Sequence, residues 1–165
     1  MNRRFLLLGS AALLASCTAS GPVRLAPGST LILTRHGDRS GSDEMLNATG
    51  RTRARALVRA LEGQPLDAIY SPGIQRNLDT AAPLAGARGL TVTRIPQETP
   101  TAALAAAAAG GPVLWVGNKG NLAEIWETLA LPGEVPLNYG DLTFIRSDAE
   151  GRVTVERRHY GPATG

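Results

Sequence analysis

Short apolar runs alternate along this chain with longer segments in which apolar residues recur at helical spacing. The short runs, typical of buried strands, cover residues 31–34, 67–71, 90–95 and 113–116. The helical spacing predicts helices from 49 to the breaker at 63–65, over 102–109 and over 122–129. Another helix follows the loop that begins at 72, and Pro83 limits or kinks it. Two last strands, near 142–146 and 153–157, flank a turn at 148–151. This alternation predicts an α/β protein, a three-layer α/β/α sandwich with a largely parallel sheet.

The N-terminal part of the sequence carries a targeting signal. Two arginines precede an apolar run over residues 5–14, which is too short to span a bilayer and is typical of a secretory signal. Residues 14–17 read Leu-Ala-Ser-Cys and resemble the lipobox of bacterial lipoproteins, in which the cysteine is lipidated and becomes the mature N-terminus. A plain signal peptide with a coincidental cysteine is the alternative.

Three parts of the chain are therefore expected. They are a lipoprotein signal peptide over 1–16, a Gly- and Pro-containing tether over 17–29 and a single domain over 30–160. Cys17 is the only cysteine, so an internal disulfide is impossible. Because Thr18 follows it, the resemblance to lipoproteins favours the outer membrane of a Gram-negative envelope, or the periplasmic face of a membrane there.

The charge balance argues against a nucleic-acid partner. The formal net charge of +3 includes Arg3 and Arg4, and without them 15 basic residues stand against 14 acidic ones. The basic residues are also dispersed rather than clustered on one segment.

The candidate chemistry lies where the first predicted strand ends. Residues 31–39 read Leu-Ile-Leu-Thr-Arg-His-Gly-Asp-Arg, so an apolar strand leads directly into Arg35, His36 and Arg39. Arginines supply fixed positive charge, and a histidine nitrogen can be neutral near pH 7. Ligands of open α/β sheets sit beyond the carboxyl ends of the strands. This combination suits a phosphoryl group.

Other polar residues follow the remaining predicted parallel strands. They are Ser71 and Arg76 after the second strand, Glu98 after the third and Asn118 after the fourth. Because such strand ends meet at one edge of the sheet, we expect these residues to lie near His36.

Four segments together resemble the histidine phosphatase superfamily, also called phosphoglycerate mutase-like, and specifically its short single-domain members. They are Arg-His-Gly at 35–37, Leu-Asn-Ala-Thr-Gly-Arg at 46–51, the arginine and Thr-Ala within 76–81, and Val-Leu-Trp-Val-Gly at 113–117. The resemblance extends from residue 31 to 160.

This resemblance implies a mechanism. A neutral His36 would attack phosphorus to give a phosphohistidine that water then cleaves. Arg35 and Arg76 would hold the phosphoryl oxygens, with Ser71 and Asn118 as further phosphate contacts. No metal or cofactor is implied. Mutase activity is not expected, because no long insertion encloses a phosphoglycerate.

Three features depart from the family pattern. Asn118 stands where the family has its second histidine, and an amide can donate a hydrogen bond but carries no charge. The spacing from Ser71 to Arg76 is one residue longer than usual. No proton donor to the leaving group is evident; Glu98 is the candidate by position and Asp38 the next.

Three functions remain open on the sequence. The first is a lipid-anchored phosphatase that hydrolyses phosphomonoesters through His36, weakened by Asn118. The second is an inactive family member that binds a phosphorylated small molecule or phosphoprotein. The third is a lipoprotein that uses the fold only as a scaffold.

Overall fold

The computed structural model describes residues 21–163, which form six strands and four helices. The strands are β1 (Thr30–Arg35), β2 (Ala68–Ser71), β3 (Val92–Arg94), β4 (Val113–Gly117), β5 (Asp141–Ser147) and β6 (Val153–His159). The helices are α1 (Ala48–Ala60), α2 (Gln75–Arg88), α3 (Thr101–Ala108) and α4 (Lys119–Thr128). The expected signal peptide and Cys17 lie outside the described residues. No helix within residues 21–163 has the length and apolar character needed to cross a bilayer.

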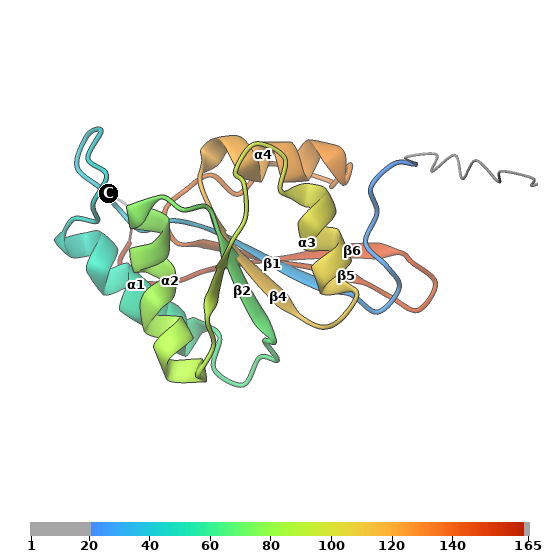
Figure 1. Ribbon diagram of the computed structural model, residues 1–165, viewed down its shortest axis with the longest axis horizontal. Coiled ribbons are helices and arrows are strands. Elements are labelled where there is room, and N and C mark those ends of the chain that lie inside the picture. The colour runs from blue at the N-terminus through green and yellow to red at the C-terminus, as the bar shows by residue number, and fades with distance from the viewer. Residues whose placement is uncertain (1–20, 164–165) are drawn as a thin grey trace, which may run out of the picture.

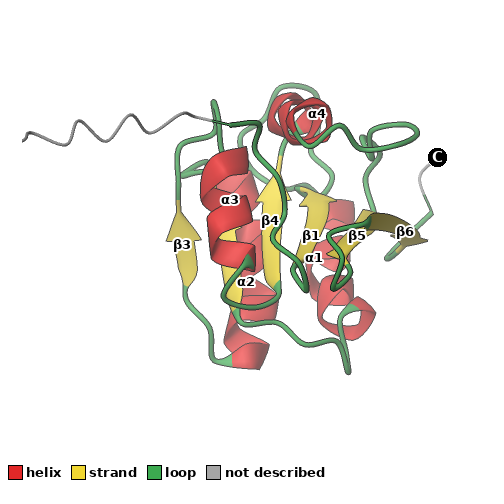
Figure 2. Cartoon of the chain, turned by 90° about the vertical axis from the view of Figure 1, so that its right-hand side faces the viewer, coloured by secondary structure: helices red, strands yellow, loops and turns green. Residues whose placement is uncertain are grey.

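The strands form one mixed sheet in the order β3-β2-β4-β1-β5-β6. Strands β3, β2, β4 and β1 run parallel to one another, whereas β5 is antiparallel to both β1 and β6. In Figures 1 and 2, α1 and α2 cover one face of the sheet and α3 and α4 cover the other. The predicted α/β/α sandwich is confirmed, with a parallel part and an antiparallel hairpin at one side.

Each face of the sheet has its own hydrophobic core, because alternate residues of a strand point to opposite faces. On the α1–α2 face, Ile32 of β1 packs with Leu57 of α1 and Leu84 of α2. On the α3–α4 face, Leu33 packs with Leu104 and Ile125. The central strands β1 and β4 are buried on both faces, which explains their unbroken apolar sequences.

Two helices differ from the sequence prediction. Helix α2 continues through Pro83 to Arg88, because Leu84 and Ala85 beyond the proline are buried against the sheet and outweigh the one lost backbone hydrogen bond. Helix α4 begins at Lys119, three residues before the predicted start at 122. Asn118 caps this helix, and asparagine is among the residues most favoured at such a position.

The domain also begins earlier than expected. Leu25 is buried in the α3–α4 core, and the Gly28 and Ser29 backbones exchange hydrogen bonds with Ser147 at the end of β5. The segment from residue 25 onward is therefore attached to the domain.

Candidate functional site

The carboxyl ends of β1 and β4 lie side by side and bring the sequence motifs together. Arg35 is the register partner of Gly117, and the backbone N–H of His36 donates to the Gly117 carbonyl at 2.9 Å. His36 and Asn118 thus follow two neighbouring strands. Arg76, in the first turn of α2, completes the group by contacting the His36 ring.

The hydrogen bonds of His36 fix its tautomer. Nδ1 lies 2.7 Å from the Gly37 carbonyl oxygen, which can only accept, so the ring proton resides on Nδ1. Nε2 therefore carries the lone pair, and the Arg76 Nε–H donates to it at 3.1 Å. The nitrogen that faces the arginine is the nucleophilic one.

The surroundings of His36 keep the ring neutral. The residue is 2% exposed, and burial lowers the pKa of its imidazole from 6.5 to about 4. The hydrogen bond to Gly37 opposes this shift, whereas the charges of Arg35, Arg76 and Arg39 add to it. At neutral pH nearly every molecule therefore presents an unprotonated Nε2.

Arg35 is held against the loop that precedes β5. Its guanidinium lies over the Tyr139 ring, with Cζ 3.8 Å from the centroid, and its Nη1 donates to the Leu137 carbonyl at 3.0 Å. Its buried Nε has no hydrogen-bond partner among the described residues. Burial is the main cause that lowers the pKa of Arg35 and of Arg76, and Arg39 adds charge repulsion to both. Three guanidinium groups gathered around a neutral imidazole favour an anion.

The turn after His36 is possible because two glycines touch. A Cβ on Gly37 would lie 2.8 Å from the Gly50 carbonyl oxygen, and one on Gly50 would overlap the backbone of Asp38. The Gly37 N–H donates to the Thr80 hydroxyl of α2 at 2.8 Å, and that hydroxyl donates to the Arg76 carbonyl. The Thr of the second motif thus joins the nucleophile's turn to the helix that carries Arg76.

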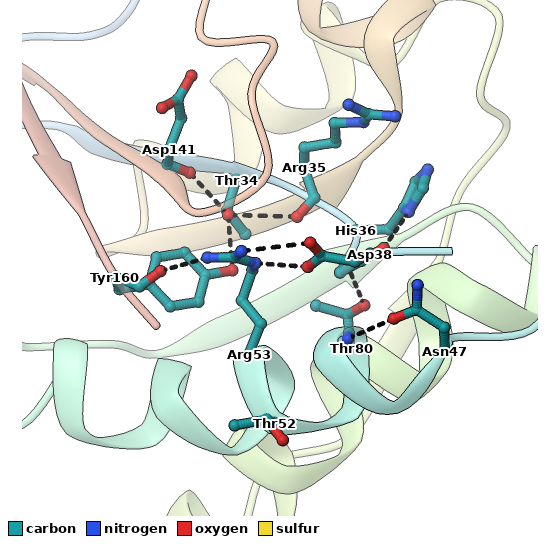
Figure 3. A network of polar contacts seen from close by, with 12 residues as sticks. Thr34, Arg35, His36, Asp38, Asn47, Thr52, Arg53, Thr80, Asp141 and Tyr160 are labelled. Carbon is teal, nitrogen blue, oxygen red and sulfur yellow. Dashed lines mark hydrogen bonds and ion pairs between the residues drawn. The ribbon is translucent and has the colours of Figure 1, made fainter. Parts of the chain in front are cut away.

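Asp38 has a structural role. Its carboxylate pairs with the fully buried Arg53 guanidinium at 2.6 Å, and Arg53 Nη1 also donates to the Tyr160 carbonyl (Figure 3). The Tyr160 hydroxyl shares a hydrogen bond with Thr34, and burial raises the pKa of this phenol to about 12. The side chains of Arg35 and His36 extend away from this network. Asp38 is therefore not a free proton donor, which corrects its place as the second acid candidate.

The structure also locates Ser71 and Glu98, the other two residues predicted for the site. Ser71 is fully buried, and its hydroxyl donates to the backbone carbonyls of Pro72 and Val116, so this arrangement does not support contact with a phosphoryl group. Glu98 is exposed in the segment between β3 and α3. The neighbouring Gln97 reaches the site instead, through Asn118.

Asn118 is occupied by structural contacts. Its side-chain oxygen accepts from the Asn121 N–H at 3.3 Å, and the Asn121 side chain accepts from the Asn118 N–H at 2.9 Å, which completes a capping box for α4. Its amide nitrogen donates to Gln97 at 3.1 Å. This bond uses one of the two N–H groups of the amide, and the other is left to donate to a phosphoryl oxygen.

Sequence analysis did not single out two residues that the fold brings to this site. Tyr139 packs on Arg35, and its ring centroid lies 5.8 Å from that of His36. Glu44, on the loop before α1, is the carboxylate whose charge raises the pKa of Arg76. Both residues are on irregular segments, where no periodic pattern indicates which residues face inward.

The described part of the chain has no candidate metal centre, and it has an apolar cavity away from this site. Within residues 21–163 no group of three His, Cys, Asp or Glu side chains is arranged to hold a metal ion. A cavity of about 690 Å³ lies elsewhere, between segment 23–27, α3 and the β5–β6 hairpin, and Ala, Leu and Val side chains make up most of its lining.

Comparison with known proteins agrees with the geometry. Residues 31–97 match the family model of the histidine phosphatase superfamily (branch 1). The structure is similar to that of the protein histidine phosphatase SixA complexed with tungstate, with a TM-score of 0.61 and 19% identity over 79% of this chain and 96% of that one. The putative phosphohistidine phosphatase SixA from Agrobacterium tumefaciens gives a TM-score of 0.60 and 23% identity over 81% of this chain and 99% of that one.

A third similar structure is the phosphoserine phosphatase from Entamoeba histolytica in complex with 3-phosphoglyceric acid, with a TM-score of 0.58 and 15% identity over 81% of this chain and 97% of that one. A search of the curated proteins found no match. At these identities the structures show the shared fold, and the family match shows the sequence pattern of the site. The family match thus covers residues 31–97, the part of the chain that carries Arg35, His36 and Arg76, and the described domain shares the fold of these solved structures.

Proposed function

We propose that this protein hydrolyses phosphomonoesters through a phosphohistidine formed on His36. The observation that supports this most is the state of the His36 ring, which is neutral, has its proton fixed on Nδ1 by Gly37 and directs the Nε2 lone pair toward Arg76. Arg76 donates to that lone pair at 3.1 Å. A bound phosphoryl oxygen would draw the guanidinium to itself and release Nε2 for attack.

The reaction has two steps. Nε2 bonds to phosphorus as the bond from phosphorus to the ester oxygen breaks, and the departing alcohol takes up a proton. Water then attacks phosphorus, the N–P bond breaks, and inorganic phosphate leaves. Arg35 and Arg76 hold the phosphoryl oxygens in both steps, and their positive charge offsets the negative charge on those oxygens.

The leaving group is expected to control the rate. Asp38 is tied to Arg53, and Glu98 is exposed, so neither is placed as an evident acid. Esters whose alcohol leaves without protonation, such as aryl phosphates, should therefore react much faster than alkyl phosphates. Fast hydrolysis of alkyl phosphates would require a proton donor to the leaving alcohol, and neither Asp38 nor Glu98 is an evident one.

Asn118 is expected to weaken turnover. Loss of one donor to a developing oxyanion typically reduces the rate by about 10²–10³, and the Asn118 amide is already bonded to Gln97. The lack of a charged donor at position 118 also favours a second candidate function, the binding of a phosphorylated small molecule or phosphoprotein without turnover.

Hydrolysis of an aryl phosphate by the purified full chain distinguishes the two. Wild type, His36→Ala, Asn118→His and Asn118→Ser are compared, with His159→Gln as the control for the other histidine. We expect wild-type turnover that His36→Ala abolishes and His159→Gln leaves intact, and a gain in Asn118→His. Asn118→Ser keeps a helix-capping oxygen and should show no gain.

The outcomes separate the proposals. An inert wild type with an active Asn118→His variant indicates a binding protein whose phosphate site is intact. If no variant is active and inorganic phosphate does not raise the melting temperature, both proposals fail, and the scaffold function remains.

We also propose that the protein is anchored in the cell envelope by lipid on Cys17. The support is the sequence alone, namely the Arg-Arg pair, the apolar run over 5–14 and the Leu-Ala-Ser-Cys segment. Labelling with an alkyne-bearing fatty acid should mark the wild type and not Cys17→Ser, and the wild type should sediment with membranes. Equal labelling of both would refute the anchor.

A further inference from the structure

We infer that the Tyr139 hydroxyl donates a hydrogen bond to the phosphoryl group that the Arg35–His36–Arg76 site binds. This rests on the proposed phosphate chemistry of that site and adds a contact that the sequence pattern did not indicate. It also supplies a neutral donor in a site where Asn118 is already bonded to Gln97.

The position of Tyr139 is the first reason. Its ring lies against the Arg35 guanidinium, with Cζ 3.8 Å from the ring centroid. The same ring is tilted by 59° to the His36 imidazole, with 5.8 Å between the centroids. A side chain in contact with a phosphate-binding arginine and next to the nucleophile forms one wall of the space that a phosphoryl group would fill.

The free hydroxyl is the second reason. Tyr139 is half-buried, and within residues 21–163 no hydrogen bond engages its phenolic oxygen. That oxygen is close enough to both arginines for its ionisation to raise the pKa of Arg35 and of Arg76. It therefore lies within electrostatic range of both guanidinium groups that would clamp the ligand, and its O–H donor is unused.

The turn that carries Tyr139 is rigid, which is the third reason. Gly140 has φ +87°, and a Cβ there would lie 2.6 Å from the Tyr160 carbonyl oxygen. The Asp141 carboxylate accepts from the Asn138 N–H at 2.9 Å, and the Gly140 carbonyl accepts from the Tyr160 N–H at 2.9 Å. The turn is thus fixed on both sides of Tyr139, so little ordering is needed when a ligand arrives.

Tyr139→Phe tests the donor separately from the stacking. The phenyl ring can still pack on Arg35, so the melting temperature should stay within about one degree of wild type. The hydrogen bond to a charged oxygen is lost, so we expect kcat/KM for an aryl phosphate to fall about 10-fold to 100-fold and the Ki of tungstate, used as a phosphate mimic, to rise similarly. Tyr70→Phe, which removes a hydroxyl on β2, is the matched control and should change neither.

Tyr139→Leu completes the test by removing both the hydroxyl and the aromatic face. If Tyr139 only positioned Arg35 through stacking, Tyr139→Phe would match wild type and Tyr139→Leu alone would be impaired, which would overturn the inference. Wild-type activity together with an unaffected Tyr139→Phe refutes this inference and leaves the proposed function standing. A wild type that neither hydrolyses the ester nor binds tungstate refutes both. Tungstate binding that weakens in Tyr139→Phe supports the inference even if the wild type is inert.

Discussion

The pKa of His36 is the prediction on which the proposed mechanism depends most. Burial and three nearby arginines lower the pKa of this imidazole to about 4. A histidine with its ordinary pKa near 6.5 would be only about 3% neutral at pH 5, whereas one with a pKa near 4 would be about 90% neutral there. Lowering the pH from 7 to 5 would therefore reduce the fraction of neutral imidazole about 25-fold in the first case and by about 10% in the second.

Nuclear magnetic resonance can measure this directly, because the chain has only two histidines. The ring C2 protons of His36 and His159 are followed from pH 8 to pH 3.5, and His159→Gln assigns the two signals. We expect the His36 signal to stay in its neutral position down to about pH 5. Arg76→Met should raise the pKa of His36, because one of the charges that disfavour the imidazolium is removed, but not to 6.5, since burial is the larger cause.

A His36 signal that titrates near pH 6.5 would refute this reasoning. The imidazole would then be solvated and partly protonated at neutral pH, and the buried, pre-formed nucleophile would not exist. The substrate's own ionisation does not affect this experiment, because no substrate is present. The pH dependence of kcat/KM should agree with it once the ionisation of the phosphate ester, near pH 6, is taken into account.

Further predictions concern stability. Asp38→Ala should lower the free energy of unfolding in urea by about 3–5 kcal/mol, because Arg53 is left buried without its carboxylate; Glu156→Gln, at the exposed pair with Arg146, should change it little. Gly50→Ala should destabilise the protein and impair activity, because the added methyl overlaps the Asp38 backbone that follows Gly37; Gly86→Ala, on α2 with nothing within 4 Å of the added Cβ, should be tolerated. The lowered pKa of His36 means that the folded state binds fewer protons, so stability is retained above pH 6.5 and declines as the pH falls toward about 4; His36→Gln should show a smaller decline between pH 7 and pH 4.

Asn118 caps helix α4 and also stands at the position proposed to contact the phosphoryl group. As the cap of α4 it satisfies backbone N–H groups that a histidine side chain would leave open, so Asn118→His should cost about 0.5–2 kcal/mol of stability. If that variant gains activity, the natural sequence has a more stable helix start and a weaker oxyanion site.

The sequence by itself determined the fold class and the identity of the chemical groups. Short apolar runs and the period-3.6 pattern are local features, so strands, helices and the hairpin could be located from them. The rule that parallel strand ends meet at one edge correctly brought Arg35, His36 and Asn118 together, as the register of β1 with β4 shows. Arg76 also reached this site, as the second motif indicated.

Only the tertiary structure decided what each group is free to do. Tyr139 contacts Arg35 from an irregular loop, Asp38 is paired with Arg53, and the buried Ser71 hydroxyl bonds to the neighbouring strand β4. These contacts join residues that are separated in the sequence. They depend on how the helices pack and how the loops run, and neither produces a periodic pattern in the sequence. A sequence shows which donors and charges exist. Which of them remain available to a ligand depends on the neighbours that folding brings to them.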